Sequence, residues 1–128
     1  MYKEDGVQKA IVNYLRFKGY IFTSPAGGLI HSWKTQRVAN SLGYMTGCAD
    51  LIVFVPNGCV HIEVKRPKIL AVSNKTGKMI QRDAGGKQSV SQKEFQGRIE
   101  KIPGQHYLVA TNVADVDQYF KNMCISPY

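Results

Sequence analysis

The sequence has no long hydrophobic run. Its longest apolar stretches are about five residues, whereas a membrane-spanning helix requires roughly 20. The N-terminal residues 1–6 are polar and lack the apolar region of a secretory signal. We therefore expect a protein that does not enter a membrane and that resides in the cytoplasm.

Cysteine is also scarce. The three cysteines, Cys48, Cys59 and Cys124, are odd in number and form no CxxC pair. A disulfide framework and a zinc ribbon both need paired cysteines, so neither is expected. The sequence predicts small, buried or half-buried thiols in a reducing compartment.

Acidic residues are few. The chain has 17 Lys and Arg residues against 9 Asp and Glu residues, a net charge of +8 and a pI of about 9.5. A basic domain attracts polyanions, which makes nucleic acid the first partner to consider. The 128 residues suit a single domain over 1–128, and a hydrophobic content of 44% supplies one core.

Hydrophobic periodicity and turn residues predict the element order αβαββαβα. Helices are expected over 5–18, 32–42, 91 to about 102, and 112–122, and strands over 20–24, 50–55, 60–66 and 106–110. Ser91 is the expected N-cap of the third helix, with Glu94 as its capping-box partner. This order predicts a layered α/β domain, and the hairpin over 50–66 makes its sheet mixed.

Residues from about 68 to 90 form a basic insertion. We expect a long loop there, with a short β-ribbon inside it as the alternative; such loops are usually functional or disordered. Its cations are Lys68, Lys75, Lys78, Arg82 and Lys87.

The strand over 60–66 carries the most informative pattern. Because side chains alternate between the faces of a strand, His61, Glu63 and Lys65 share one face. The carboxylate and the ammonium then lie about 6–7 Å apart along the strand. Asp50 begins the partner strand, directly before an unbroken apolar run.

The hairpin register decides whether these groups meet, because directly opposite residues share a face. With a loop over 56–59, Asp50 lies opposite Lys65 and diagonal to Glu63. With a loop of only Pro56 and Asn57, Asp50 lies directly opposite Glu63. A three-residue loop would turn Asp50 to the other face and would remove the site.

Two carboxylates brought together repel each other and favour a cation. Carboxylate oxygens with open water positions suit a hard ion such as Mg²⁺, which activates water and polarises a phosphodiester. A neighbouring lysine can orient or deprotonate that water. Asp50, Glu63 and Lys65 therefore predict a hydrolytic centre for a phosphate backbone.

Several further short motifs are spread over nearly the whole chain. They are Glu4 with Gln8 in the first helix, the segments 47–51 (GCADL) and 62–65 (IEVK), and Ser91-Gln92 at the next helix. In this order they resemble the virus-type replication-repair nuclease (VRR-NUC) family of the PD-(D/E)xK superfamily. Ala49 departs from the proline that often precedes the aspartate, and the insertion before Ser91 is longer than in a compact member.

The resemblance implies a restriction-endonuclease-like three-layer α/β domain, with a central mixed sheet flanked by helices, and a Mg²⁺-dependent endodeoxyribonuclease in which Mn²⁺ can substitute. It also implies a homodimer that acts on branched DNA, such as four-way junctions or flaps, in a bacterial or phage-infected cell. Lys65 would be the catalytic lysine and Gln92 would support the site. The implied metal ligands are Asp50, Glu63, the Val64 carbonyl and Glu4.

Other candidates have ordinary alternatives. Glu4 and Gln8 share a helix face, where an exposed helix start is as good an explanation as a metal role. His61 could touch substrate or the water shell of the metal, but such a residue is more often a solvated strand histidine. The expected DNA contacts are Lys34, Arg37, Lys68, Lys87 and Lys93, with His31 and Trp33 in the same basic-aromatic cluster as Lys34.

Other functions compete with that of a DNA endonuclease. A non-catalytic nucleic-acid-binding module with a nuclease fold is the main alternative, although a decayed enzyme usually loses a residue such as Asp50, Glu63 or Lys65. An RNA-directed nuclease or a restriction-type enzyme is a further possibility. The latter would have to use the basic insertion for sequence recognition.

Overall fold

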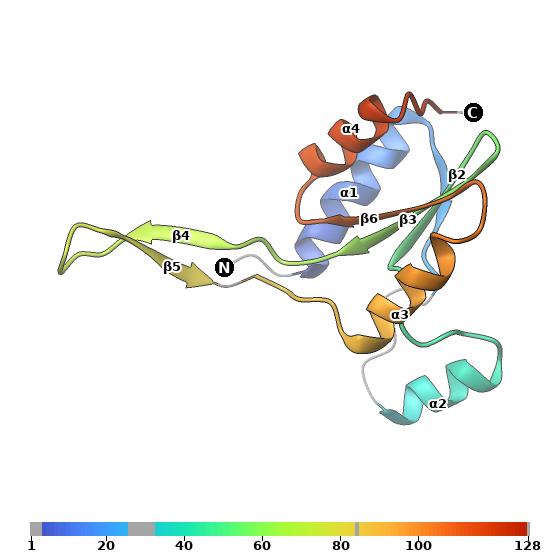
Figure 1. Cartoon of the computed structure of the whole chain (residues 1–128), viewed down its shortest axis with the longest axis horizontal. Coiled ribbons are helices and arrows are strands. Elements are labelled where there is room, and N and C mark those ends of the chain that lie inside the picture. The colour runs from blue at the N-terminus through green and yellow to red at the C-terminus, as the bar shows by residue number, and fades with distance from the viewer. Residues whose placement is uncertain (1–3, 26–32, 84, 128) are drawn as a thin grey trace.

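The structure, a computed structural model, describes residues 4–25, 33–83 and 85–127. Within these ranges the chain is a mixed α/β domain with a central sheet flanked by helices and a separate two-stranded ribbon (Figure 1). The predicted α/β class and mixed sheet are confirmed. None of the described helices combines the length and apolar character needed to cross a membrane.

The central sheet has the strand order β1-β2-β3-β6. Its antiparallel strands are β1 (Ile21–Thr23), β2 (Leu51–Val55) and β3 (Gly58–Val64). The last strand, β6 (Gln105–Ala110), pairs parallel to β3. The β2–β3 hairpin and the β3–β6 crossover together make the sheet mixed.

The β2–β3 hairpin has a two-residue loop. Val55 pairs with Gly58, which leaves Pro56 and Asn57 between the strands. Asn57 has a φ of 68°, so proline followed by a left-handed residue forms the type II turn pattern. The same register pairs Leu51 with Ile62, and it therefore places Asp50 opposite Glu63, as the shorter of the two predicted loops required.

Helices cover both faces of the sheet. On one face, α1 (Glu4–Lys18) and α4 (Val113–Asn122) pack over the main core. On the other face, α3 (Val90–Ile99) packs through Phe95 against Tyr107 and Ala49. In Figure 1, α2 (Trp33–Ser41) lies apart from the sheet, and it packs on no other described element. Fully buried members of the main core include Ile11, Leu15, Leu51, Val60, Ile62 and Val116.

The start of α3 differs from the prediction. Its N-cap is Ser89 and not Ser91, because the Ser89 side chain accepts a hydrogen bond from the backbone N–H of Gln92 at 3.2 Å. The Gln92 side chain completes the capping box by accepting from the Ser89 N–H at 2.8 Å. Glu94 is therefore not the capping partner and lies exposed on the helix. The sequence offered two Ser-x-x-(Glu/Gln) spacings, and the earlier one caps the helix.

The basic insertion contains the β-ribbon that was the alternative to a loop. Its strands, β4 (Ile69–Val72) and β5 (Met79–Asp83), pair with each other and form a sheet separate from the central one. Figure 1 shows this ribbon extending away from the rest of the chain as a long arm. We call residues 66–87 the arm.

Candidate active site

Asp50 and Glu63 meet because the hairpin register places them opposite each other at one end of the β2–β3 pair. Glu63 is almost completely buried, with 1% of its surface exposed, whereas Asp50 is half-buried. The backbone N–H of Val64 donates to Oδ2 of Asp50 at 2.8 Å. This bond fixes the Asp50 carboxylate beside the strand that carries Glu63.

Lys65 extends the same face of β3 by two residues. Its backbone N–H donates to the Ala110 carbonyl at 2.9 Å, so pairing with the β6 chain continues through this position. Its Nζ lies 3.4 Å from Oε1 of Glu63, and only 7% of the residue is exposed. The structure therefore brings together the three residues that the sequence predicted as a centre.

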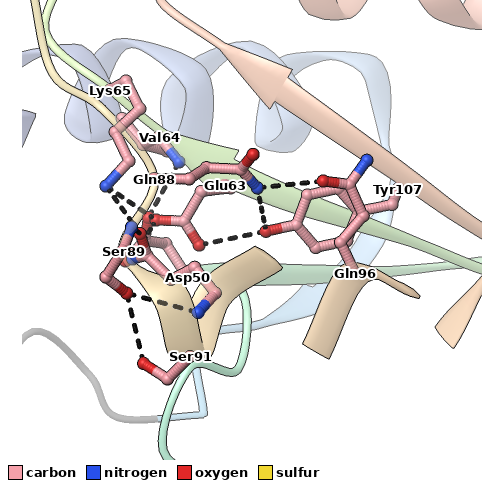
Figure 2. Close-up of polar contacts among 10 residues, drawn as sticks. Asp50, Glu63, Val64, Lys65, Gln88, Ser89, Ser91, Gln96 and Tyr107 are labelled. Atoms are coloured by element: carbon pink, nitrogen blue, oxygen red, sulfur yellow. Dashed lines mark hydrogen bonds and ion pairs between the residues drawn. The ribbon is translucent and has the colours of Figure 1, made fainter. Parts of the chain in front are cut away.

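Gln92 joins this group from the first turn of α3. Its Nε2 donates to Oε1 of Glu63 at 2.8 Å, and its Oε1 accepts from Nζ of Lys65 at 3.0 Å. The same Oε1 also accepts from the Ser89 backbone N–H. Figure 2 shows Asp50, Glu63 and Lys65 converging next to Ser89 and the start of the helix. The capping box of α3 therefore also orients a side chain of the centre.

Tyr107 is a member of this network that the sequence analysis did not identify. Its hydroxyl donates to Oε2 of Glu63 at 3.5 Å and accepts from Nε2 of Gln88 at 3.2 Å (Figure 2). Gln88 donates in addition to Gln96 on α3 at 3.0 Å. Only the parallel β3–β6 register, which sets Tyr107 beside His61, places this hydroxyl on the Glu63 face.

The pKa of Glu63 is raised from 4.5 to about 8. Burial is the main cause, and the neighbouring Asp50 carboxylate adds to it, while Lys65 acts in the opposite direction. Ionisation of Glu63 would place a second negative charge beside Asp50 in a buried position, which is unfavourable. A cation placed between them would relieve this cost, and perturbed carboxylates of this kind concentrate at functional sites.

The same two carboxylates affect groups in the segment before β2. Burial raises the pKa of the Cys48 thiol and of the Tyr44 hydroxyl, and Asp50 and Glu63 raise both further. Both side chains are half-buried. Cys48 and Tyr44 therefore border the site.

Gly47 allows this segment to reach the helix. It has a φ of 88°, and a Cβ at this position would overlap the backbone carbonyl of Ser91 in the first turn of α3. The backbone that leads to Asp50 therefore packs directly on the helix that carries Gln92. Only glycine combines this left-handed conformation with such a close approach.

Glu4 lies at the edge of the group. A Cβ on Gly86 would come 2.8 Å from Oε1 of Glu4 and 3.0 Å from Cδ of Lys65. Both side chains therefore pack closely against Gly86. Among the described residues, no hydrogen bond or ion pair joins Glu4 to Asp50 or Glu63. Glu4 is thus a neighbour of Lys65 and not part of the carboxylate pair.

His61 is buried and not solvated. It is 5% exposed, its Nε2 shares a hydrogen bond of 2.7 Å with Oε1 of Gln105, and its ring meets the edge of Phe95. Its Nδ1 is buried without a partner among the described residues. The prediction of a solvated strand histidine was wrong because α3 covers this part of the sheet.

The predicted DNA contacts are exposed lysines and an arginine outside this buried group. Lys34 and Arg37 lie on α2, Lys68 and Lys87 at the base of the arm, and Lys93 on α3. His31 falls outside the described residues, as does the side chain of Trp33.

In the part of the chain that the structure describes, no three His, Cys, Asp or Glu side chains are grouped closely enough to hold a metal ion. The site instead offers two carboxylates, Asp50 and Glu63, next to the Val64 backbone. Mg²⁺ commonly binds through one or two carboxylates and keeps several waters, so this donor set suits Mg²⁺ better than a metal that needs a full side-chain cage. The raised pKa of Glu63 fits the same role.

Comparisons with known proteins add no relative. No family model, no curated protein and no solved structure matches this chain.

Proposed function

We propose that this chain is a metal-dependent DNA endonuclease of the PD-(D/E)xK type, with the restriction-endonuclease-like fold and the VRR-NUC resemblance that its motifs suggest. The observation that carries the proposal is the buried Glu63 carboxylate, opposite Asp50 and 3.4 Å from Nζ of Lys65. An exposed Glu-x-Lys stripe on a strand would have no such partners. A buried group of this kind costs stability, and catalysis is the reason we propose for its presence.

Mg²⁺, with Mn²⁺ as a substitute, would be held by Asp50, Glu63 and the Val64 carbonyl, with Glu4 contributing through water. When bound, the ion would polarise the phosphodiester, activate a water and stabilise the leaving oxygen. The raised pKa of Glu63 supports this assignment, because a carboxylate pair that resists ionisation gains most from a divalent cation.

The residues of the chain have distinct roles in this proposal. The ammonium group of Lys65 orients the attacking water and stabilises negative charge that develops on the phosphate. Gln92 is a positioning residue, since its amide holds both Glu63 and Lys65. Tyr107 on β6 positions Oε2 of Glu63 through its hydroxyl.

Branched DNA is the proposed substrate, and a homodimer the proposed active form. The basic charge of +8 supports a polyanionic substrate, and exposed cations lie on α2, on α3 and at the arm. One subunit has one centre, so paired nicks across a four-way junction require two subunits related by a two-fold axis. Two surfaces are candidates for such a contact: the apolar surface near Tyr44, where Leu42 and Met45 are 83% and 49% exposed, and the last helix, α4.

Cleavage assays with matched substrates test this proposal. Labelled four-way junction, flap, linear duplex and single-stranded RNA would each be incubated with Mg²⁺, with Mn²⁺, and with EDTA. We expect metal-dependent cuts in a branched DNA and none in RNA. Binding without any cut in either metal would favour the non-catalytic binding module, and cuts in RNA alone would favour the RNA-directed enzyme.

A further inference from the structure

The two strands of the arm, β4 and β5, contact each other and pack on no other helix or strand in the described part of the chain. An isolated two-stranded ribbon is only marginally stable in water, so a ribbon of this kind usually has a surface to rest on. Figure 1 shows the ribbon extending away from the central sheet, with β4 running outward and β5 returning.

Exposed apolar side chains lie on both faces of the ribbon. Leu70 pairs with Gln81 and Val72 pairs with Met79, which places these side chains on one face, and Ala71 pairs with Ile80, which is 40% exposed, on the other. Leu70, Val72 and Met79 are 52%, 54% and 62% exposed. A row of apolar side chains on a free ribbon is a surface that another molecule covers.

Charge identifies that molecule. Residues 66–87 hold six Lys and Arg residues and one acidic residue, Asp83. Lys75 and Lys78 are exposed at the tip, where Ser73 N–H donates to the Lys78 carbonyl at 2.7 Å and Gly77 N–H to the Ser73 carbonyl at 2.9 Å. The turn therefore presents two cations from a hydrogen-bonded frame. Two exposed cations on such a frame attract the phosphates of duplex DNA.

The arm is anchored directly next to the candidate centre. Gly86 N–H donates to the Arg66 carbonyl at 3.0 Å, and Nη2 of Arg66 donates to the Gly85 carbonyl at 3.2 Å. Arg66 follows Lys65 in the chain, so the two ends of the arm are joined at the edge of the site. At about 3.3 Å per residue, the tip lies about 25 Å from this point, which corresponds to about seven base pairs of duplex.

We infer that the arm is a DNA clamp, which lies along a groove of the duplex beside the scissile bond. The face that carries Leu70, Val72 and Met79 rests in the groove, as apolar side chains of minor-groove proteins do, and the lysines of the tip pair with the flanking phosphates. This inference rests on the proposed function, because the DNA that the arm holds is the substrate of the Asp50–Glu63–Lys65 centre. It adds a second, non-catalytic binding element with a defined reach.

Binding without metal tests the clamp separately from cleavage. The affinity for a labelled 24-base-pair duplex would be measured in EDTA at several salt concentrations, for wild type, Lys75→Ala/Lys78→Ala and the control Lys18→Ala/Lys101→Ala. Lys18 and Lys101 are exposed, lie outside the arm, and give the same change in charge. Each lost phosphate contact lowers the slope of log affinity against log salt by about 0.9. We expect the tip variant to lose about two such contacts, with an affinity loss of roughly tenfold or more, beyond any loss in the control.

A shortened arm supplies the second readout. Joining Ile69 to Asp83 through an Asn-Gly turn keeps the anchored base and removes the ribbon. The protected footprint on DNA should then contract by about seven base pairs on one side. An unchanged footprint, or a tip variant equal to its control, would overturn the clamp.

The two proposals can fail independently. Metal-dependent cleavage with an unchanged salt slope would leave the nuclease intact and remove the clamp. A reduced slope without cleavage of any substrate would keep the clamp and remove the nuclease. If Leu70→Ser/Met79→Ser converts a dimer to a monomer in sedimentation while the tip variant equals its control, the arm is a contact between subunits and the clamp is wrong.

Discussion

The side-chain amide of Gln92 donates a hydrogen bond to Oε1 of Glu63 at 2.8 Å from the first turn of α3. Its oxygen accepts from Nζ of Lys65 at 3.0 Å. One uncharged group therefore holds the carboxylate and the ammonium in a fixed relation, and it belongs to a residue of the capping box of α3. Gln92 therefore contributes both to the positions of Glu63 and Lys65 and to the stability of α3.

Substitution of Gln92 separates these two contributions. Gln92→Ala should lower kcat on the preferred DNA by about 10- to 100-fold, the usual effect of removing a supporting contact at a metal site. KM should change little, because Gln92 orients the centre and does not hold the DNA. The loss of the cap should also lower the free energy of unfolding by about 1 kcal/mol.

Ser89→Ala is the matched control for this variant. It removes the Ser89 hydroxyl that accepts from the Gln92 N–H but leaves the Gln92 amide in place. We expect a similar decrease in stability in urea titrations and a kcat within about threefold of wild type. Equal losses of kcat in both variants would show that Gln92 acts through the helix alone.

The pH dependence of stability follows from Glu63. Without metal, its pKa in the folded chain is raised to about 8 from 4.5, so the folded state keeps a proton that the unfolded chain releases. Stability should therefore fall as pH rises through this interval, by up to about 1.4 kcal/mol per pH unit. Glu63→Gln has no proton to lose, so its Tm should depend less on pH. The difference in Tm between Glu63→Gln and wild type should be several degrees more in favour of the variant at pH 8 than at pH 5.

Addition of Mg²⁺ is the control for this pH effect. If Asp50 and Glu63 hold the ion, Mg²⁺ should raise the Tm of the wild type at pH 8 and leave that of Glu63→Gln nearly unchanged. The thermal unfolding curves of both proteins at pH 5 and pH 8, in EDTA and in Mg²⁺, provide the measurement. A parallel response of the two proteins to pH in EDTA would show that Glu63 ionises normally.

Gly47 should not tolerate a side chain. Its φ of 88° and the contact of its backbone with Ser91 mean that Gly47→Ala would strain the backbone and push the Asp50 segment from α3. We expect a loss of about 2 kcal/mol or more in the free energy of unfolding, together with loss of cleavage. Gly97→Ala on α3 has open space and should instead stabilise the chain by about 0.5–1 kcal/mol. Urea titrations of the two variants give the comparison.

The sequence was most informative where structure is local. Alternation along β3 placed His61, Glu63 and Lys65 on one face, and the short turn at Pro56 and Asn57 set Asp50 opposite Glu63. These facts depend on residues close in the chain, so a pattern of period two and the length of one loop were sufficient.

What the sequence missed depends on contacts between distant segments. Tyr107 reaches Glu63 only through the parallel pairing of β6 with β3, and His61 is buried only because α3 lies over it. The N-cap was misplaced because Ser89 and Ser91 both satisfy the capping spacing, and the packing of Gln92 on Glu63 favours the first. The sequence did not decide between a loop and a ribbon for the arm. Its strands pack on no core, so they show no clear alternation of apolar and polar residues.

Single-turnover cleavage by wild type and Lys65→Ala is the most direct test of the catalytic centre. A labelled four-way junction would be cut in Mg²⁺, with binding of both proteins to the same junction measured in Ca²⁺. Our account predicts that Lys65→Ala, and Asp50→Ala beside it, bind with nearly wild-type affinity but cut at least about 1,000-fold more slowly, as expected when a group that acts in the transition state is lost. Equal cleavage rates for wild type and Lys65→Ala would contradict the account and would place any nuclease activity elsewhere.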